Sequence, residues 1–409
     1  MYRKTYVEIN IDNLKNNVKN IVNYYNDYDY YFGVVKGNCY SHGTTYVINE
    51  LIESGVNYLA VSSLEEGLEA RQINKKIPIL SLEPIRVEYL DICAKNNITM
   101  TVHDYNYAKE LINKKIDKKI KVHLKIDSGM NRLGFKDKNQ LKEIYTELKN
   151  KENIEIEGIF THFATLGIND KEWDNQLEKF KEITSEIDIN EIPIRHLAKS
   201  AAFINHPKIE FSNGIRLGIA MYGYDSTPKY SNKGIKNKLR AIKRYLYKKK
   251  NNISKTITEL PIELKPAFKM YTEVMQIKKL KQGEFVGYGA GYRAKQDEII
   301  AILPSGYDDG LFRKSKGRYV SINNKRYHLV GDVAMGMISV KVDDTVKMYD
   351  KVTLIGEEIP IKEVARHNET IVYEIMCNIG KQIPRVYIKD GEVFAIEEGK
   401  WVDLIWRII

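Results

Sequence analysis

Two patterns of apolar and polar positions alternate along the first half of the chain: helical spacing and short continuous apolar runs. Segments with apolar residues at helical spacing, such as 64–72, 105–113 and 139–149, separate shorter apolar runs. Those runs occupy residues 31–35, 58–61, 77–82, 98–102, 122–126, 154–160, 192–197 and 215–220. Eight strand candidates that alternate with helices predict a parallel (β/α)8 barrel of the TIM type, with a doubly wound sheet as the alternative.

The pattern changes at about residue 265, where short segments of alternating apolar and polar residues begin, separated by turn residues. The pair Asn323–Asn324 between two such segments is typical of a hairpin turn. We therefore predict an α/β barrel at residues 1–227, a junction segment at 228–262 and a mostly β domain at 263–409. Within the junction segment, helical spacing predicts a short basic amphipathic helix carrying Ile235, Leu239, Ile242 and Leu246.

The formal net charge of +10 is concentrated in one place. Residues 229–255 hold eleven Lys and Arg and no acidic residue, so the rest of the chain carries a net charge near −1. Binding of nucleic acid by the body of the protein is therefore not expected. No apolar run reaches the length of about 18 residues that spans a bilayer, so we expect no membrane contact. The first residues lack the apolar stretch of a secretory signal, so we expect a cytoplasmic protein.

The three cysteines, Cys39, Cys93 and Cys377, show no metal-binding or CxxC spacing. We expect reduced thiols and no metal site.

Lys36 follows the apolar run at 31–35 and precedes Gly37 and the pair His42–Gly43. In a βα barrel the carboxyl ends of the strands face the active site. A lysine partly removed from water there has a lowered pKa, so its amine can form a Schiff base with an aldehyde cofactor. Taken alone, one lysine among so many is better explained as a surface lysine at the end of a strand, and the residues around Lys36 reverse that interpretation.

Ten segments in a fixed order carry a resemblance to a known family. They are FGVVKGNCYSHG at 32–43, VSSLEEGLEARQ at 61–72, HLKIDSGMNRLGF at 123–135, GIFTHFAT at 158–165, HLAKSAAF at 196–203, GIRLGIAMYGY at 214–224, GYGAGY at 287–292, LPSGYDDG at 303–310, VGDVAMG at 330–336 and IPRVY at 383–387. Together they resemble the alanine racemase family over nearly the whole chain, apart from 228–262 and the last dozen residues. The resemblance implies a pyridoxal 5'-phosphate (PLP) racemase, most simply of alanine, that supplies a D-amino acid for peptidoglycan. It also implies a homodimer in which the β domain completes the partner's active site.

Racemisation removes the Cα proton from one face of the substrate and returns a proton to the other, so two groups must flank it. PLP supplies the electron sink. By the resemblance, Lys36 holds the cofactor and serves the D-face, and Tyr288 of the other subunit serves the L-face. A tyrosine, with an ordinary pKa near 10, needs a positive neighbourhood to act as a base.

The resemblance assigns further residues to the cofactor and the substrate. Arg216 is implied to donate to the pyridine nitrogen of PLP, with His162 supporting it. The groups implied to bind the cofactor phosphate are Tyr40, Ser200, Gly218 and Ile219. The groups implied to contact the substrate are Arg132, which suits a carboxylate, and Tyr307 and Met335 of the partner. Lys125 matches a lysine that is often carbamylated in the family.

Four positions depart from the family pattern: Lys199, Asp332, Gly336 and Lys381 stand where Asn, Arg, Asp and Tyr are usual. We expect them to change side-chain specificity while PLP binding is kept. A racemase of serine or a larger amino acid, or a degenerate PLP-binding homologue, are the alternatives. A PLP decarboxylase of similar architecture lacks support, because no convincing phosphate loop or catalytic cysteine is present. A single-barrel PLP carrier would lack the second domain.

Overall fold

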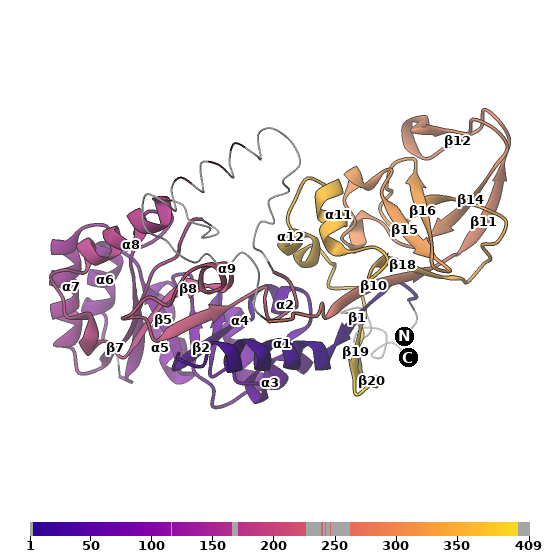
Figure 1. The fold of residues 1–409 in the computed structure, drawn as a ribbon. Helices are drawn as coiled ribbons and strands as arrows, with labels where there is room; N and C mark the ends of the chain where they lie inside the picture. The colour runs from indigo at the N-terminus through magenta and orange to yellow at the C-terminus, as the bar shows by residue number, and fades with distance from the viewer. Residues whose placement is uncertain are drawn as a thin grey trace. The chain divides into compact units, whose positions relative to one another are not determined.

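The computed structural model describes residues 3–115, 117–165, 171–225, 239, 242, 246 and 262–399. Its backbone forms two compact units, and the colour in Figure 1 follows residue number from indigo to yellow. The first unit is the barrel unit, Leu14–Lys36 and Ile48–Lys265. The second is the C-terminal unit, Met1–Asn13, Gly37–Val47 and Pro266–Ile409.

The barrel unit contains a closed parallel barrel whose eight strands are hydrogen-bonded in sequence order, which confirms the predicted fold. The strands are β2 (Tyr30–Val34), β3 (Tyr58–Val61), β4 (Ile79–Ser81), β5 (Ile98–Val102), β6 (Ile120–Lys125), β7 (Ile154–Phe160), β8 (Ile194–Lys199) and β9 (Gly214–Leu217). Side chains fill both faces of these strands, and all five residues of β5 are buried. Burial on both faces explains why the strands read as unbroken apolar runs in the sequence.

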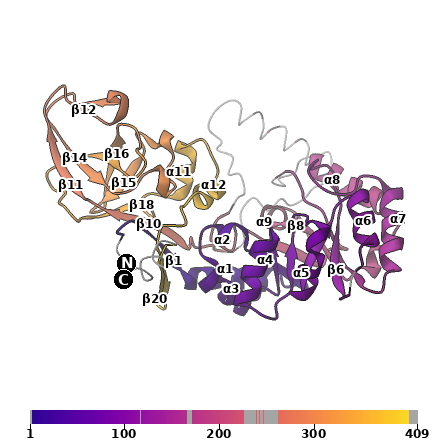
Figure 2. The same cartoon turned by 180° about the vertical axis from the view of Figure 1, so that it is seen from behind.

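Helices surround the barrel strands, as Figures 1 and 2 show from opposite sides. They are α1 (Ile11–Tyr24), α3 (Thr44–Glu53), α4 (Leu64–Ile73), α5 (Leu90–Lys95), α6 (Tyr105–Asn113), α7 (Lys138–Lys149), α8 (Lys171–Ile183) and α9 (Ser200–Asn205). Local capping fixes where several begin. The Asp104 side chain accepts from the amide of Tyr107, and the Asp137 side chain accepts from the amides of Asn139 and Gln140.

The C-terminal unit is built on a ten-stranded sheet, which confirms the predicted β domain. In spatial order its strands are β11 (Gln276–Leu280), β14 (Glu298–Leu303), β17 (Ile338–Val342), β16 (Lys325–Val330), β15 (Tyr319–Ile322), β18 (Lys351–Ile355), β10 (Phe268–Glu273), β1 (Tyr6–Asn10), β19 (Arg385–Lys389) and β20 (Glu392–Glu397). Two short helices, α11 (Ile361–His367) and α12 (Val372–Cys377), lie side by side in this unit (Figure 1).

The N-terminal strand β1 belongs to this sheet and not to the barrel. It pairs antiparallel with β10 and parallel with β19, so the first residues of the chain join strands more than 250 positions away. The predicted barrel at residues 1–227 includes residues 1–10, because a local pattern does not reveal a distant strand partner. The hairpin at Asn323–Asn324 is confirmed: Ile322 pairs with Lys325, and both asparagines have positive φ angles, 51° and 62°.

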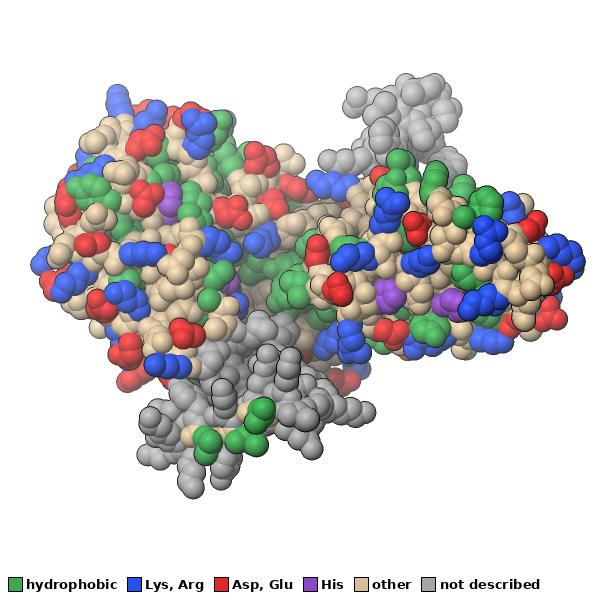
Figure 3. Space-filling view, turned by 90° about the horizontal axis from the view of Figure 1, so that it is seen from above, with side chains coloured by type: hydrophobic (Ala, Val, Ile, Leu, Met, Phe, Trp, Pro, Cys, Tyr) green, Lys and Arg blue, Asp and Glu red, His purple; other side chains and the backbone are tan. Residues whose placement is uncertain are grey.

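The predicted basic helix within 228–262 falls almost wholly outside the described residues. Leu239, Ile242 and Leu246 are helical, and each is more than half exposed. Within the described part of the chain, no helix combines the length and the apolar character needed to cross a membrane. Basic and acidic side chains are interspersed over the face drawn in Figure 3. Cys39 and Cys93 are buried, and Cys377 is exposed.

Candidate active site

Cationic side chains gather at the carboxyl ends of the barrel strands. Lys36 follows β2, Lys125 ends β6, Lys199 ends β8, and Arg216 lies in β9 opposite Lys199 in the sheet register. Arg132 lies in the loop after β6. In addition to burial, the charges of Arg216, Arg132 and Lys36 lower the pKa of Lys125, and those of Lys199 and Lys125 lower the pKa of the neighbouring His162. Positive charge is therefore concentrated in this region. Such an arrangement favours the binding of anions.

Arg216 is buried and donates four hydrogen bonds from its two terminal nitrogens. Nη1 donates to Nδ1 of His196 at 2.9 Å and to the carbonyl of the same residue. Nη2 donates to the carbonyls of Thr161 and Leu197 at 2.8 and 2.9 Å. Burial lowers the pKa of Arg216 to about 9, which still leaves it charged at neutral pH. No described residue accepts from Nε of Arg216, so that donor is left for a further group.

A relay of hydrogen bonds runs from Arg216 through the barrel interior to a buried carboxylate. His196 Nε2 lies 2.9 Å from His123 Nδ1, and His123 Nε2 lies 3.2 Å from the carboxylate of Glu157. Arginine can only donate and an ionised carboxylate can only accept, so both histidines must carry their proton on Nε2. Burial lowers the pKa of His123 and of His196, which keeps both rings neutral as the relay requires.

Aromatic rings hold the relay in place. Phe32 is stacked between Tyr58 and His196, with ring centroids 4.5 and 4.3 Å away, and His196 is stacked on Phe160 at 4.7 Å on its other face. Phe32 has no exposed surface. The imidazole of His196 therefore cannot rotate without displacing two packed rings, and the orientation of Arg216 follows from it.

Lys125 lies beside the same rings, with its ammonium nitrogen 4.1 Å from the centroid of Phe160. Burial, followed by the nearby charges of Arg216 and Arg132, lowers the pKa of Lys125 well below its usual value. The loop that carries Arg132 is fixed by Asp127, whose carboxylate accepts from the amides of Gly129 and Asn131 at 3.1 and 2.9 Å.

Ser200 begins α9, and its hydroxyl oxygen accepts from the amide of Gly218 at 2.9 Å. The adjacent Lys199 is half-buried, and burial together with Arg216 and Arg132 lowers its pKa to about 8. Ile219 is buried directly after Gly218. The Ser200 hydroxyl and the Lys199 ammonium thus lie where β8 and β9 end, and both are donors that suit a phosphate group.

In the C-terminal unit, Tyr40 lies in a left-handed turn that the sequence pattern did not predict. The φ angles from Gly37 to Ser41 are all positive, between 52° and 64°. A non-glycine residue in this conformation costs about 1–2 kcal/mol, so the turn must be held by its surroundings. Nε of Arg385 donates to the carbonyl of Ser41 at 2.9 Å, and Asn38 accepts from the amide of Thr44 at 3.0 Å.

Three further predicted residues, Tyr288, Tyr307 and Met335, are exposed on the C-terminal unit. Tyr288 is 72% exposed and lies in a one-turn 3-10 helix, Tyr288–Ala290, between β12 (Phe285–Val286) and β13 (Tyr292–Arg293). The amide of Tyr307 donates to Ala334 at 3.0 Å, which brings Tyr307 beside the loop of Met335. The described residues of this unit therefore leave these side chains without a covering layer.

Three of the positions that depart from the family pattern lie at least partly at the surface of the C-terminal unit. Asp332 lies 3.7 Å from Arg313 and 4.0 Å from Lys316, so its negative charge is partly balanced. Gly336 and Lys381 are exposed.

His162 lies near Arg216, whose charge adds to burial in lowering the pKa of His162. Arg216 itself donates a hydrogen bond to Nδ1 of His196. Sequence reasoning missed His196, His123 and Glu157. The available signal was three polar residues inside buried strands, where each must have a partner.

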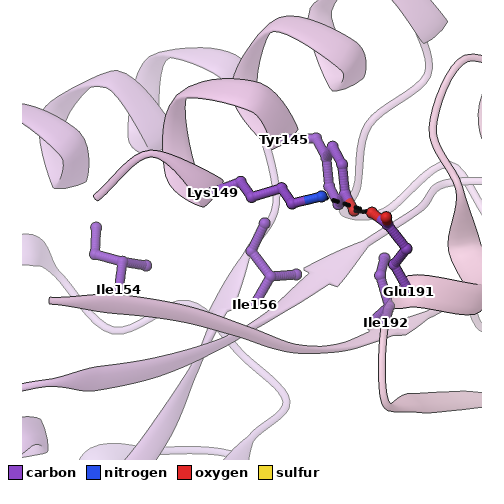
Figure 4. Close-up of a pocket in the computed structure, with 6 residues that line it drawn as sticks. All are labelled: Tyr145, Lys149, Ile154, Ile156, Glu191 and Ile192. Atoms are coloured by element: carbon purple, nitrogen blue, oxygen red, sulfur yellow. Dashed lines mark hydrogen bonds and ion pairs between the residues drawn. The ribbon is translucent and has the colours of Figure 1, made fainter. Parts of the chain in front are cut away.

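A surface hollow elsewhere on the barrel does not belong to this cluster. It is drawn in Figure 4 and lies where β7 begins, at Ile154 and Ile156, away from the carboxyl ends of the strands. Glu191 in this hollow accepts from Lys149 and Tyr145 at 2.6 and 3.1 Å, so its charge is already paired. No group of three or more potential metal-binding side chains occurs in the part of the chain that the structure describes.

Comparison with known proteins covers both units. The family model described as "Alanine racemase, N-terminal domain" matches residues 9–226, and "Alanine racemase, C-terminal domain" matches residues 267–387. Alanine racemase 1 of Bacillus subtilis is 32% identical over 400 residues, which cover 97% of this chain and 96% of that protein.

Solved structures agree with this relationship. The alanine racemase from Bacillus anthracis with bound L-Ala-P superposes with a TM-score of 0.85 at 32% identity, covering 98% of this chain and 99% of that one. Histidine racemase from Leuconostoc mesenteroides subsp. sake superposes with a TM-score of 0.80 at 25% identity, covering 95% and 99%. The same architecture therefore occurs in proteins named for different amino acids.

Proposed function

This chain belongs to the alanine racemase family, and we propose that it is a PLP-dependent racemase that interconverts L- and D-alanine. The observation that carries the proposal is the cationic cluster at the carboxyl ends of the barrel strands. It combines a lysine amine, Lys36, with donors suited to a phosphate and to a carboxylate. A PLP-bound amino acid offers both anions, so the donor set fits the cofactor and the substrate together.

The residues that would hold PLP follow from their donors. Lys36 supplies the amine for the covalent link, and Ser200, Gly218, Ile219 and Tyr40 are proposed to bind the phosphate. When bound, PLP withdraws electrons from the substrate Cα and so makes its proton removable. The unused Nε of Arg216 is proposed to donate to the cofactor ring. Because Arg216 stays charged and cannot accept a proton, a ring nitrogen that it contacts would remain unprotonated.

Two residues are proposed to move the Cα proton, Lys36 on the D-face and Tyr288 on the L-face. Tyr288 is exposed on its own unit, which supports a role at another copy of the chain. We therefore propose a homodimer in which the β domain, residues 263–409, completes the partner's barrel site in residues 1–227. Tyr307 and Met335 are proposed to line the substrate pocket from the same side.

Arg132 is proposed to bind the substrate carboxylate, and Lys125 to orient Arg132 after carbamylation. Carbamylation needs a neutral amine, and burial lowers the pKa of Lys125, which shifts its side chain toward the neutral form. The carbamate would replace a potential cation by an anion among Arg132 and Arg216. It would thereby lower the mutual repulsion of the cluster.

A larger or polar substrate is the second candidate. Lys199 adds a half-buried cation, and a histidine racemase shares the architecture. We propose a cytoplasmic location, where cysteines are ordinarily kept reduced, as expected for the three in this chain.

The test combines a spectrum with a stereochemical assay. The purified chain with PLP should show the visible absorbance band of a lysine-linked cofactor. Lys36→Ala should lose that band, whereas Lys119→Ala, a change at an exposed lysine of the same unit, should keep it. Incubation in heavy water should then exchange the Cα proton of alanine with inversion, faster than for serine or histidine. Absence of the band in the unaltered chain would refute the proposal, and faster inversion of another amino acid would change the substrate.

A further inference from the structure

The side chain of Tyr288, which is proposed above to move the Cα proton on the L-face, is carried by a small ribbon of the C-terminal unit. The strands β12 and β13 form a separate two-stranded sheet with two register pairs, Phe285–Arg293 and Val286–Tyr292. A ribbon of this size is not stable in water by itself. The position of Tyr288 therefore depends on the contacts that fasten the ribbon to its surroundings.

The turn between the two strands also needs support from its surroundings. Gly289 and Ala290 follow Tyr288 with positive φ angles of 65° and 51°. Glycine adopts this conformation readily, but Ala290 adopts it at a cost in free energy, because its Cβ crowds the backbone. The amide of Gly291 donates to the carbonyl of Tyr288 at 3.2 Å and closes the turn. This bond lies within the turn, so it does not fix the turn on the rest of the unit.

The first anchor of the ribbon is a buried carboxylate of the ten-stranded sheet. Only 1% of the Glu298 side chain is exposed, and its Oε1 accepts from Lys341 at 2.7 Å. The other oxygen, Oε2, accepts from the hydroxyl of Tyr292 in β13. Burial and then the hydrogen bond to Glu298 raise the pKa of Tyr292 to about 12, so its hydroxyl keeps the proton that it donates. The Tyr292 side chain also packs against a cluster of buried apolar residues, Val286, Ile300 and Val330.

The second anchor holds the end of the turn. Nζ of Lys316 donates to the carbonyl of Gly291. Asp332 lies beside the same turn, because a Cβ on Gly291 would be 3.2 Å from its Oδ1 and a Cβ on Gly287 would be 3.6 Å from its backbone nitrogen. The Asp332 carboxylate is 4.0 Å from the ammonium of Lys316. Arginine, which is usual in the family at position 332, would repel Lys316, whereas aspartate attracts it.

We propose that Tyr292 and Lys316 are positioning residues for Tyr288. Glu298 fixes Tyr292 from the sheet, and Asp332 attracts Lys316 at the end of the turn. The inference rests on the proposed role of Tyr288 as the L-face group. A general base must lie within hydrogen-bonding reach of the proton that it removes, and a displacement of about 1 Å can cost about 100-fold in rate. Loosening either anchor should therefore slow proton transfer on the L-face and leave the D-face and the binding of PLP unaffected.

The test compares Cα-proton exchange in heavy water at L-alanine with exchange at D-alanine, using the PLP-saturated full chain. Tyr292→Phe removes only the hydroxyl that reaches Glu298, and it should slow exchange at L-alanine about tenfold or more. Lys316→Gln should slow it about threefold or more, and Lys316→Arg, which keeps a charged donor, should restore it. Exchange at D-alanine and the visible absorbance band of the cofactor should stay unchanged in all three variants.

Two matched controls remove the same chemical groups elsewhere in the unit. Tyr327 donates its hydroxyl to the carboxylate of Asp343 at 3.0 Å, and Lys314 forms an exposed ion pair with Glu369 at 3.2 Å. Neither interaction involves the ribbon. Tyr327→Phe and Lys314→Gln should therefore exchange L-alanine at the rate of the unaltered chain.

Amide hydrogen exchange over residues 283–294 gives a readout that does not depend on activity. Tyr292→Phe and Lys316→Gln should each speed amide exchange in this segment, because the ribbon opens more often, and the two controls should not. Unchanged amide exchange in both anchor variants would overturn the inference. Equal losses of Cα exchange at L- and D-alanine would also overturn it, since a general loss of structure would then explain them.

Tyr288→Phe, measured in parallel, separates this inference from the proposed function. If Tyr288→Phe slows exchange at L-alanine and neither anchor variant does, the inference is wrong and the role of Tyr288 stands. If Tyr288→Phe leaves exchange at L-alanine unchanged, the role of Tyr288 and the inference are both wrong. Selective slowing at L-alanine in Tyr288→Phe, Tyr292→Phe and Lys316→Gln is the expected result.

Discussion

Replacing Glu157 by Gln tests whether the buried relay stabilises the barrel. The two oxygens of Glu157 both accept: one from Lys121 at 2.6 Å, the other from Tyr58 at 2.6 Å and from His123 at 3.2 Å. A glutamine has one acceptor and one donor. Its amide N–H would therefore face either the ammonium of Lys121 or the N–H of His123. Either placement leaves a buried donor unpaired.

The pKa of Glu157 sets the expected magnitude. Burial alone would raise it, but hydrogen bonds from His123 and the other donors outweigh burial and lower it from 4.5 to about 2. Because the folded-state pKa is lowered, the ionised carboxylate stabilises the fold above pH 4.5, and this contribution is lost as the pH falls through 2. The shift corresponds to at most about 3 kcal/mol at pH 7 and at most about 2 kcal/mol at pH 3.5. These are upper limits, since His123 donates as a neutral ring.

Urea unfolding of the PLP-saturated protein at pH 7 and pH 3.5 measures the effect, with circular dichroism as the signal. Glu157→Gln should unfold at a lower urea concentration at pH 7, and the difference from the unaltered chain should shrink at pH 3.5. The matched control is Glu191→Gln, which breaks an exposed pair with Lys149 and should cost less than about 1 kcal/mol. A Glu157→Gln protein as stable as the control, or a difference that does not shrink in acid, would refute the assigned relay.

Three other substitutions test the site and its support. Lys199→Gln removes an amine that is charged below about pH 8. The affinity of the unaltered apoprotein for PLP, measured by fluorescence titration, should therefore fall between pH 7 and pH 9, and the affinity of the variant should fall much less. Identical pH profiles for the two proteins would contradict this. Tyr288→Phe should slow heavy-water exchange at L-alanine about 100-fold or more while exchange at D-alanine continues; equal losses for both would disprove the two-face assignment. Phe32→Ala removes a fully buried stacked ring and should cost about 3–5 kcal/mol in urea unfolding; a cost below about 1 kcal/mol would show that the stack contributes little.

The cationic cluster also links the binding of anions to the stability of the barrel unit. Burial and the charge of Arg216 lower the pKa of both Lys125 and Lys199. The protein keeps these groups close together at the cost of mutual repulsion. A bound phosphate and carboxylate would remove that repulsion, so ligand binding and stability of the barrel unit should rise together.

The barrel could be read from the sequence because its signals are local. A strand buried on both faces needs a continuous apolar run, and a helix on the outside needs apolar residues at helical spacing. The runs at 58–61, 98–102 and 154–160 therefore coincide with β3, β5 and β7, and the helical pattern at 105–113 coincides with α6. Lys36 was recognisable for the same reason, since its neighbours along the chain carry the resemblance.

Features that depend on partners distant in sequence could not be read in this way. The strand β1 belongs to the C-terminal sheet because it is hydrogen-bonded to β10 and β19. The pattern of residues 6–10 does not indicate which strands these are. The relay from Arg216 to Glu157 has its members on four different strands, and only closure of the barrel brings their side chains within hydrogen-bonding distance.

The left-handed turn at 37–41 and the buried charge of Arg318 belong to the same class. In each case the local sequence favours another state: right-handed backbone for the turn, and an exposed side chain for the arginine. Packing against the rest of the C-terminal unit overrides that preference. Local pattern thus specifies which segments are strands and helices. Long-range packing specifies where charged side chains are buried, and the hydrogen-bonded relay behind Arg216 depends on that packing.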